Sequence, residues 1–371
     1  MTSSTHADVL IVGGGPAGSA AAIALARAGY DVILVERQPV ITERVGEILP
    51  PSIKLPLMAL GVWDAFLADG PLPAVGNCSA WGGPHVAHRE FVTDPYGNGW
   101  HVDRPRFDRM LRGAAQRAGA RVELGCSLVR AERAPGGGWD LAVRSASPSS
   151  GLRAELVIDA SGRSRSFARL LGVAHDRLDA MVAYYGYVEA RADAVIETFI
   201  EATRDGWWYA APVPGGRSVV SFLTDACHIP RDRDLIAAIP AGITARLAPG
   251  ARPAQLRTVA ADSARLRTAA GDRWIAIGDA AATHDPLAAQ GIDRALRSAL
   301  RAAEAVSHAL HDRPAALGEY AEMQHAAFDA YARMRRRFYA LEQRWPTSPF
   351  WARRAETADD PQPQSQPPAT F

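Results

Sequence analysis

Residues 8–36, DVLIVGGGPAGSAAAIALARAGYDVILVE, decide the fold of this chain. A run of strand-forming residues leads into Gly13-x-Gly15-x-x-Gly18, a helix of small residues follows, and a second strand ends on Glu36. Gly13 permits a tight turn, Gly15 lets the backbone approach a pyrophosphate, and Gly18 lets helix and strand pack closely. The helix N-terminus favours phosphates, and Glu36 can accept hydrogen bonds from a ribose diol. The pattern predicts a dinucleotide site, because a Gly-rich turn in an ordinary strand–helix–strand unit leaves Glu36 unexplained.

Composition excludes several classes of protein. The chain has 371 residues, of which 48% are hydrophobic, enough for a large core and two interleaved domains. A net charge of +1 gives no field that recruits nucleic acid or a membrane surface. No apolar run reaches about 18 residues, so no membrane span is expected. The start, MTSSTHADVL, lacks a secretory pattern, and we expect a cytoplasmic protein.

Cysteine and lysine are both scarce. Cys78, Cys126 and Cys227 lie far apart in the sequence, with no CxxC pair. This spacing fits a reducing compartment and argues against a disulfide framework or a Cys-rich metal site, so we expect no metal. Lys54 is the one lysine of the chain, so a mechanism that needs a catalytic lysine has a single candidate.

Periodicity indicates how the rest of the chain is organised. Alternating residues predict an antiparallel sheet over 180–225, and helical spacing predicts helices over 231–257 and 314–345. We expect an α/β (α+β) fold with a discontinuous nucleotide-binding domain, a β-sheet substrate domain, C-terminal helices and a Pro/Gln-rich disordered tail. The nucleotide-binding domain is assigned to residues 1–75, 101–175 and 262–310, and the substrate domain to residues 76–100 and 176–261. The C-terminal helices are assigned to residues 311–350 and the tail to residues 351–371.

A second motif lies far downstream, where a short strand ends on Gly278-Asp279 and small residues follow. Pro286, Gly291 and Ile292 then open a helix. The Asp279 carboxylate can bond a polyol hydroxyl, and the helix N-terminus, which carries roughly +0.5 elementary charge, stabilises negative charge on a ligand. A turn at the sheet edge with a solvent-facing aspartate is the alternative.

Two further segments carry candidate contacts to the same ligand. In one, a buried strand ends on Asp159, and Ser161-Gly162 can turn tightly past a phosphate or a nicotinamide. In the other, VDRPRFD at 102–108 precedes a helix, and its arginine can pair with phosphate. A surface loop is the alternative for either. The candidate cofactor-binding residues are Gly13, Gly15, Pro16, Ala17, Gly18, Glu36, Arg37, Arg44, Arg104, Asp159, Gly162, Gly278, Asp279, Pro286, Gly291 and Ile292.

In this order and spacing, the four segments resemble the FAD-dependent enzymes of the para-hydroxybenzoate hydroxylase type. That group includes aromatic hydroxylases, geranylgeranyl reductases and flavin-dependent halogenases. The resemblance covers about residues 8–310 and implies FAD, a six-stranded Rossmann-like FAD-binding domain and a β-sheet substrate domain. It also implies that the cofactor carries the redox chemistry while the protein positions it and excludes water.

Two segments look closer to the halogenase-like branch of that group. Gly46-Glu47-Ile-Leu-Pro50 is similar to its GE(S/T)xxP segment beside the flavin, and GWWYAAP at 206–212 is similar to its WxWxIP segment. That branch includes monooxygenases that hydroxylate peptidyl tryptophan while quinone cofactors are made, and DGWWYAAPVPGGR reads closest to those.

For a halogenase, the resemblance implies a lysine between flavin and substrate and a halide-binding turn of the Pro-x-x-Ser-Thr-Gly type. Residues 73–81, where that lysine is expected, hold none. Ala289 and Gln290 stand where the Ser and Thr would be. Both departures argue against halogenation.

Hydroxylation requires a dry site that holds an aromatic ring beside the flavin, with one base at most. Trp207 and Tyr209 are candidates for the wall of that site, and a place in the core of a strand is the alternative. His284 is a candidate base or flavin neighbour, or else a loop histidine without a catalytic role. Glu47 is a candidate flavin-side contact, or a structural hydrogen-bonding group.

The sequence therefore predicts an FAD-dependent monooxygenase that hydroxylates an indole or phenol through a flavin C4a-hydroperoxide, with O₂ as co-substrate. NADH or NADPH supplies electrons, either directly or through a partner flavin reductase. The substrate is an aromatic small molecule, a peptide or a carrier-bound group. A flavin-dependent halogenase, a C=C reductase of the geranylgeranyl-reductase type and a binding protein without activity are the alternatives. The basic run at 333–337 is expected on a solvated helix face, or as a docking surface for an acidic partner.

Overall fold

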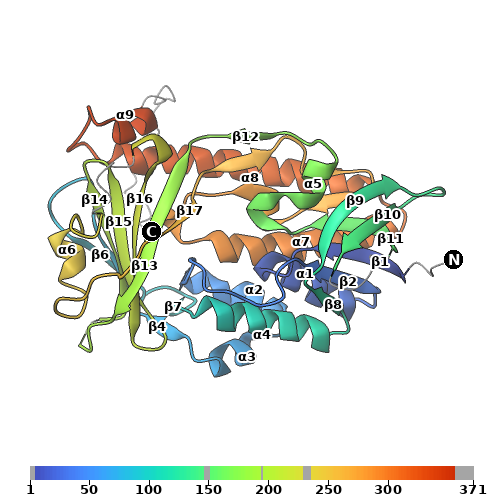
Figure 1. The fold of residues 1–371 in the computed structure, drawn as a ribbon, viewed down its shortest axis with the longest axis horizontal. Helices are drawn as coiled ribbons and strands as arrows, with labels where there is room; N and C mark the ends of the chain where they lie inside the picture. The colour runs from blue at the N-terminus through green and yellow to red at the C-terminus, as the bar shows by residue number, and fades with distance from the viewer. Residues whose placement is uncertain (1–4, 146–150, 194, 229–234, 356–371) are drawn as a thin grey trace.

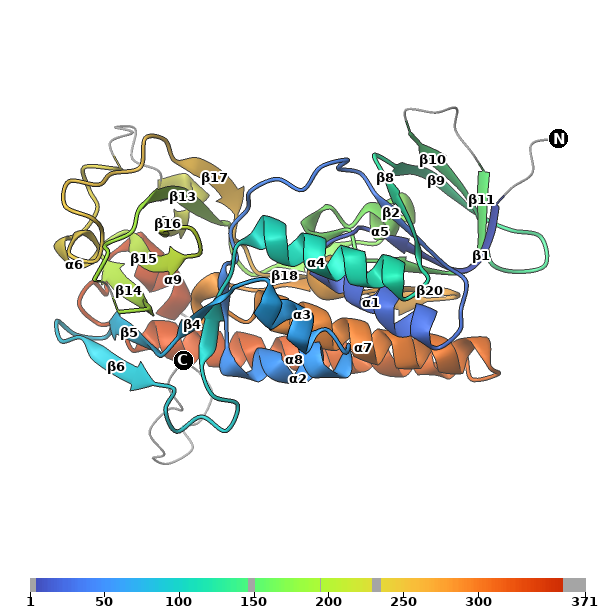
Figure 2. The same cartoon turned by 90° about the horizontal axis from the view of Figure 1, so that it is seen from below.

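Two β-sheets lie towards opposite ends of the molecule, and long helices run between and beneath them (Figure 1, Figure 2). The computed structural model describes residues 5–145, 151–193, 195–228 and 235–355. Within these residues, no helix combines the length and apolarity needed to cross a bilayer. The α/β fold predicted from the sequence is confirmed.

The first sheet has the strand order β19-β20-β11-β1-β2-β8, and β10 and β9 extend it as an antiparallel hairpin beside β11. Its central strands are parallel, and their Val, Ile and Leu side chains are buried on both faces, as parallel sheets require. The strands are β1 (Thr5–Val12), β2 (Val32–Glu36), β8 (Arg121–Leu124), β9 (Ser127–Arg133), β10 (Trp139–Arg144), β11 (Gly151–Asp159), β19 (Ala270–Gly271) and β20 (Trp274–Ala276).

Strand register brings the predicted nucleotide segments to one edge of this sheet. Val12, the last residue of β1, lies opposite Val35 of β2 and Asp159 of β11. Asp159 in turn lies opposite Ala276 of β20. The loops that follow these strands therefore leave the same edge, where open α/β sheets bind their ligands.

Helices α1 (Pro16–Arg27), α4 (Arg104–Arg117) and α7 (Gly291–Leu310) cover one face of the first sheet. The consecutive alanines 20–22 of α1 are fully buried, so α1 approaches α7 and the sheet closely. The other face packs against β9, β10 and the short helix α5 (Ser166–Leu170). Helix α8 (Ala315–Ala340) runs alongside α7 and reaches the second sheet (Figure 1).

The second sheet has the order β17-β13-β16-β15-β14-β5-β6. We call the part of the molecule built around the first sheet the first half, and the part built around the second sheet the second half. The inner face of the second sheet contacts Ile48 and Leu287 of the first half and carries Trp207, Tyr209 and Leu223. The outer face is the opposite one and carries Trp208 and Phe222. The strands are β5 (Gly76–Ala80), β6 (Ala87–Glu90), β13 (Met181–Glu189), β14 (Glu197–Thr203), β15 (Gly206–Val213), β16 (Arg217–Asp225) and β17 (Arg257–Ala260).

The remaining short elements lie between the two sheets or pack against one of them. They are β3 (Ile48–Leu49), β4 (Leu72–Ala74) and β7 (Gly99–His101); β12 (His175–Arg177), β18 (Ala264–Leu266) and β21 (Ala282–Thr283); the helices α2 (Lys54–Ala59), α3 (Trp63–Ala68), α6 (Ala241–Thr244) and α9 (Pro349–Ala355); and single 3₁₀ turns at Pro51–Ile53, Gly162–Ser164, Ala226–His228, Gly278–Ala280 and Pro286–Ala288.

Three sequence predictions outside the site were wrong. Of the helix expected over 231–257, residues 231–234 lie outside the described residues, and the rest contains only the short helix α6. Pro240 before α6 and Gly250 after it interrupt the helical backbone. The expected tail begins too early, since α9 places Trp351 in the core at 2% exposure, with its indole N–H donated to the Thr203 carbonyl. Residues 356–371 lie outside the described residues.

The third was wrong at one residue of the basic run on α8, because Arg333 and Arg337 are exposed as expected and Arg335 is not. Arg335 is not on a solvated face, because its guanidinium pairs with Asp179 at 2.7 Å and with Asp285 at 3.0 Å, and all three side chains are less than a tenth exposed. These pairs tie α8 to the segment before β13, through Asp179, and to the segment before α7, through Asp285. One member of a sequence run therefore has a buried structural role that the run itself does not reveal.

Candidate functional site

The glycine loop after β1 admits no side chain at two of its positions. Gly13 has a φ of +112°, and a Cβ there would overlap the Ala160 carbonyl. A Cβ on Gly18 would overlap the Gly13 carbonyl. At Gly15, by contrast, a Cβ would meet no atom within 4 Å, so the N-terminus of α1 faces open space. Pro16 and Ala17 form the first turn of that helix.

Glu36 and α4 hold this loop from the side. The Glu36 carboxylate accepts the Gly14 N–H at 2.7 Å and the Gln38 N–H at 2.8 Å. Arg112 donates to the Gly14 carbonyl at 3.1 Å, and burial lowers the pKa of its guanidinium. Sequence reasoning missed Arg112, although it lies four residues after Asp108 on the helix that it had predicted.

Among the predicted arginines, Arg104 has the best-defined place. It pairs with Asp108 at 3.2 Å, one turn along α4, and donates to the Val45 carbonyl at 2.7 Å. Arg44 lies 3.7 Å from the same Asp108 carboxylate. Arg37 is exposed after β2. The first two arginines therefore connect the segment before β3 to the start of α4.

Asp159 stabilises its own loop. Its carboxylate is fully buried and accepts hydrogen bonds from the Ser161 N–H and hydroxyl and from the N–H groups of Phe167 and Ala168. Burial raises the pKa of this carboxyl, and the four donors oppose that shift. Gly162 follows with a φ of +64°. Asp159 thus shapes the turn that leads to α5, and in the described structure its oxygens are taken up by that turn.

Two arginines that the sequence reasoning did not single out lie beyond this turn. Arg163 pairs with Asp262 at 2.8 Å and lies 4.0 Å from Asp279. Arg165 is 9% exposed, and its Nε and Nη2 atoms have no hydrogen-bond partner among the described residues. A buried guanidinium with unused donors indicates a place for an anionic or oxygen-rich ligand.

Asp279 lies between the starts of two helices. Gly278 has a φ of +55°, and a Cβ there would lie 2.9 Å from the Ala17 side chain, so α1 and this turn are in close contact. The Asp279 side chain is 45% exposed. The protein atoms packed around the carboxyl remove part of its hydration, and this desolvation raises its pKa. At Gly291, the first residue of α7, a Cβ would meet nothing within 4 Å. Pro286 is exposed in the preceding turn, and Ile292 is buried in α7.

Three of the four predicted catalytic residues, Glu47, Trp207 and Tyr209, come together where the two halves meet. Glu47 is 2% exposed and accepts hydrogen bonds from the Tyr187 hydroxyl and, at 2.8 Å, from the Gly46 N–H. Burial raises the pKa of the Glu47 carboxyl. Burial and the Glu47 charge together raise the pKa of Tyr209 on the inner face. Tyr187, which sequence reasoning missed, alternates onto the inner face from β13.

Trp207 belongs to an aromatic cluster on the inner face. It is 1% exposed, and its indole N–H donates to the Tyr339 hydroxyl at 3.0 Å. That hydroxyl donates to Asp285 at 2.8 Å. The rings of Trp81 and Trp351 also contact Tyr339, with centroids 5.6 and 5.8 Å away. Residues from β15, α8, α9 and the position directly after β5 thus form one wall.

His284 lies apart from that wall, against α8. Its ring meets Tyr331 edge-on at 4.6 Å and lies 5.8 Å from Phe328. Burial, together with nearby arginines, lowers the pKa of His284 to about 3. The imidazole is therefore neutral near pH 7 and too weak a base for proton abstraction there. A place beside the flavin remains the prediction for His284.

Comparison with known proteins bears on this arrangement directly. The family model described as "FAD binding domain" matches residues 6–334. The chain belongs to this FAD-binding family.

Relatives of this FAD-binding protein include oxidoreductases and halogenases. A protein named as the FAD-dependent oxidoreductase LodB of Marinomonas mediterranea is 29% identical over 363 residues, which cover 94% of this chain and 96% of the relative. A tryptophan 2-halogenase of Chondromyces crocatus is 29% identical over 367 residues, which cover 92% of this chain and 69% of the relative.

Two solved structures are similar along nearly the whole chain. The flavin-dependent halogenase CmlS has a TM-score of 0.84 at 27% identity and covers 96% of this chain and 68% of that one. The peptidyl tryptophan dihydroxylase QhpG, described as essential for tryptophylquinone cofactor biogenesis, has a TM-score of 0.77 at 26% identity, covering 96% and 80%. The expectation of an FAD-dependent enzyme of the oxidoreductase type is confirmed.

The residues at the edge of the first sheet fit FAD. Two helix N-termini face open space at Gly15 and Gly291, where a dinucleotide's phosphates and an anionic ring gain most from partial positive charge. Glu36, the last residue of β2, is hydrogen-bonded to the glycine loop, and two buried donor atoms of Arg165 have no partner among the described residues. A Cβ built at Gly15 or at Gly291 would meet no atom within 4 Å, so the space beside both positions is open.

Proposed function

We propose that this FAD-dependent oxidoreductase is a monooxygenase that hydroxylates an aromatic ring, an indole or a phenol, carried on a peptide or a carrier. The FAD-binding assignments for the glycine loop, Glu36, Arg104, Asp279 and the start of α7 belong to the same proposal. So does the division into an FAD-binding part around the first sheet and a substrate part around the second.

The position of Lys54 favours hydroxylation over halogenation. A halogenase of the resembling group places a lysine between flavin and substrate, and this chain has only Lys54. Lys54 opens α2, its ammonium lies 5.7 Å from the centre of the Trp63 ring, and α2 packs against α3 and α7. Trp63 belongs to the core beneath the first sheet, away from Trp207 and Tyr209.

Two backbone amides of the turn that corresponds to a halide site are already hydrogen-bonded within that turn. The carboxylate of Asp285 accepts the Leu287 N–H at 2.9 Å, and the Ala289 N–H bonds to the Pro286 carbonyl at 2.8 Å. These amides are therefore used inside the turn.

The chain's own residues supply a dry surface and a proton-holding group. FAD, when bound and reduced, supplies the activation of O₂. Trp207 and Tyr209 would form the apolar wall for an aromatic substrate. Glu47, whose pKa burial raises, holds a proton to higher pH than an exposed carboxyl and shares its hydrogen bond with Tyr187. NADH or NADPH, used directly or through a flavin reductase, would supply the electrons.

Mass spectrometry of the product tests the reaction class. Purified protein with FAD, NADH or NADPH, and a flavin reductase is incubated with indole- and phenol-bearing peptides under labelled O₂, with chloride and bromide present. We expect one or two labelled oxygen atoms in the product. A product in which chlorine or bromine replaces hydrogen would contradict the proposal, as would oxygen-independent saturation of a C=C bond. Glu47→Gln should lower turnover, whereas Glu43→Gln, at a partly exposed position that pairs with Arg217 and Arg257, serves as the matched control.

A further inference from the structure

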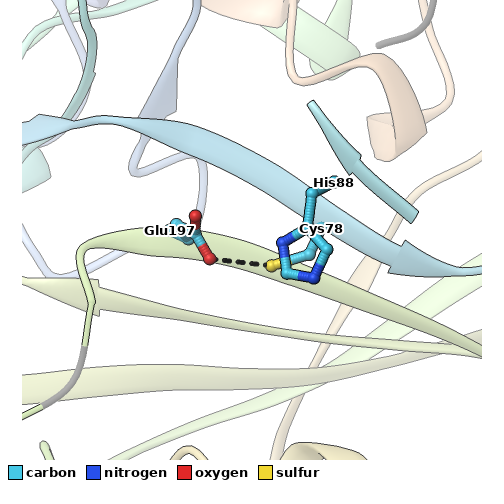
Figure 3. A group of neighbouring side chains, drawn as sticks. All are labelled: Cys78, His88 and Glu197. Carbon is cyan, nitrogen blue, oxygen red and sulfur yellow. Dashed lines mark hydrogen bonds between the residues drawn. The ribbon is translucent and has the colours of Figure 1, made fainter. Parts of the chain in front are cut away.

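The outer face of the second sheet holds a donor cluster that the flavin chemistry does not use. Cys78 on β5 and His88 on β6 are direct cross-strand partners, and Glu197 projects from the adjacent β14 (Figure 3). The Cys78 thiol donates to Glu197 Oε2 at 3.0 Å. One donor atom from each residue lies within 4.8 Å of the other two. In the part of the chain that the structure describes, this is the one group of three such residues with donors so close.

The kinds of donor and their spacing match zinc. Zinc binds sulfur at about 2.3 Å and imidazole nitrogen or carboxylate oxygen at about 2.1 Å, which places tetrahedral ligands roughly 3.5 Å apart. The observed separations need adjustments of an ångström or so to reach this value. A thiolate and a carboxylate together balance the charge of a divalent cation, and the thiolate favours zinc over the harder magnesium or calcium.

Space for a fourth ligand adjoins the cluster. His88 and Glu197 line a hollow of about 370 Å³, together with Arg191, Asp193 and Arg246. Arg191 pairs with Asp193, and Arg246 donates to the Gly242 carbonyl while also interacting with the Cys78 thiol, which leaves the hollow itself open. A water molecule in the hollow can therefore complete the tetrahedron.

We propose that Cys78, His88 and Glu197 bind one zinc ion on the outer face of the second sheet, with its fourth position open to the hollow. Coordination releases the thiol proton to solvent, as zinc binding to cysteine requires. A nucleophilic cysteine is the competing interpretation, and the cobalt spectrum described below distinguishes the two.

The zinc ion would join three strands at an exposed edge of the sheet. β6 is the last strand of the sheet and pairs only with β5, so a metal linking β6 to β5 and β14 secures an otherwise weakly held strand. Trp81 follows β5 directly and packs on Trp207 and Tyr339 of the inner face. Metal on one side of β5 thus supports the aromatic wall on the other.

Metal content and cobalt spectroscopy test this site independently of enzyme activity. The full chain with FAD is stripped with EDTA, reloaded with zinc or cobalt(II), passed through a desalting column, and measured by elemental mass spectrometry and absorption. We expect one equivalent of zinc per chain, and a cobalt form with a thiolate charge-transfer band and four-coordinate d–d bands. His88→Gln, at an exposed position, should weaken zinc binding at least about tenfold without affecting folding.

The controls separate this site from incidental binding. Cys78→Ser should remove the charge-transfer band, whereas Cys227→Ser should keep it. His85→Gln, on the exposed loop of the same hairpin, should bind zinc as the parent protein does. The proposal is overturned if the parent retains no more zinc than the His88→Gln variant, or if the cobalt form lacks a thiolate band.

Discussion

The glycine loop after β1 and the inner face of the second sheet are both candidate ligand contacts, but they are built differently. The loop depends on backbone geometry within one short segment, since Gly13 and Gly18 have no room for a Cβ. The inner face depends on side chains that are far apart in the sequence. Trp207 bonds to Tyr339 across 132 residues, and Trp351 bonds to Thr203 across 148.

This difference determines how each site fails and how readily each can be found. A backbone-built site is lost through one misplaced methyl group, whereas a wall of packed rings loses stability in proportion to the volume removed. A backbone-built site also leaves a motif in the sequence. Rings gathered from four elements leave only scattered aromatic residues.

The largest expected effect is at Gly18. Gly18→Ala places a Cβ against the Gly13 carbonyl, so we expect loss of bound flavin and a free energy of unfolding lowered by about 3 kcal/mol or more. Gly15→Ala enters open space at the helix N-cap, so the apoprotein should change by less than about 1 kcal/mol. FAD affinity of that variant should still fall at least about tenfold, or 1.4 kcal/mol.

Urea unfolding of the apoprotein and quenching of flavin fluorescence measure the two quantities separately. Gly318→Ala, within α8 and clear of neighbours, is the control and should raise stability by up to about 1 kcal/mol. If Gly15→Ala binds FAD as tightly as the parent, the loop is not the phosphate site.

The same contrast explains what the sequence could predict. The glycines, Glu36 and Asp279 could be predicted as ligand contacts because strand, turn and helix follow each other locally. Arg165 and Tyr187 were missed because their roles arise only when β11, β13 and the loop before β3 meet. His284 was found by position, but its low pKa depends on Phe328 and Tyr331, which α8 brings from more than forty residues away.

The second prediction concerns the packed wall. Trp351→Ala removes a ring that is 2% exposed and contacts Trp81 and Tyr339, and it leaves the Thr203 carbonyl without its donor. We expect urea unfolding to show a loss of about 3–5 kcal/mol. Met334→Ala, half exposed on α8, should stay within about 0.5 kcal/mol. A loss below about 1 kcal/mol for Trp351→Ala would show that α9 is not part of the core.

The third prediction is a pH dependence set by His284. Its pKa falls from 6.5 in the unfolded chain to about 3 in the folded protein, so the neutral form is favoured by folding. The resulting stability is complete above pH 6.5 and is lost as the pH falls towards 3, by at most about 1.4 kcal/mol per pH unit. The pKa values of Glu47 and Asp279 are raised by desolvation, so these two carboxyl groups gain stability from folding as the pH falls, opposite to His284. Both groups are present in all the variants compared, so their contribution cancels in the difference.

Unfolding of His284→Phe and of the parent at pH 7 and pH 5 measures that contribution as a difference. The variant should lose less stability on acidification than the parent, and His85→Gln, an exposed control, should behave as the parent does. Equal pH dependence of His284→Phe and the parent would mean that His284 is accessible to protons in the folded protein.

The smallest expected effect distinguishes the two halves most sharply. Lys54→Met removes the chain's only ammonium side chain but keeps its aliphatic bulk beside Trp63, so stability should change by no more than about 1 kcal/mol. Because Lys54 belongs to the first half, hydroxylation on the inner face should continue at the parent's rate, as product mass spectrometry can show. If the parent makes a halogenated product and Lys54→Met does not, this lysine reaches the substrate, and the inner face is then completed by a residue from outside the second sheet.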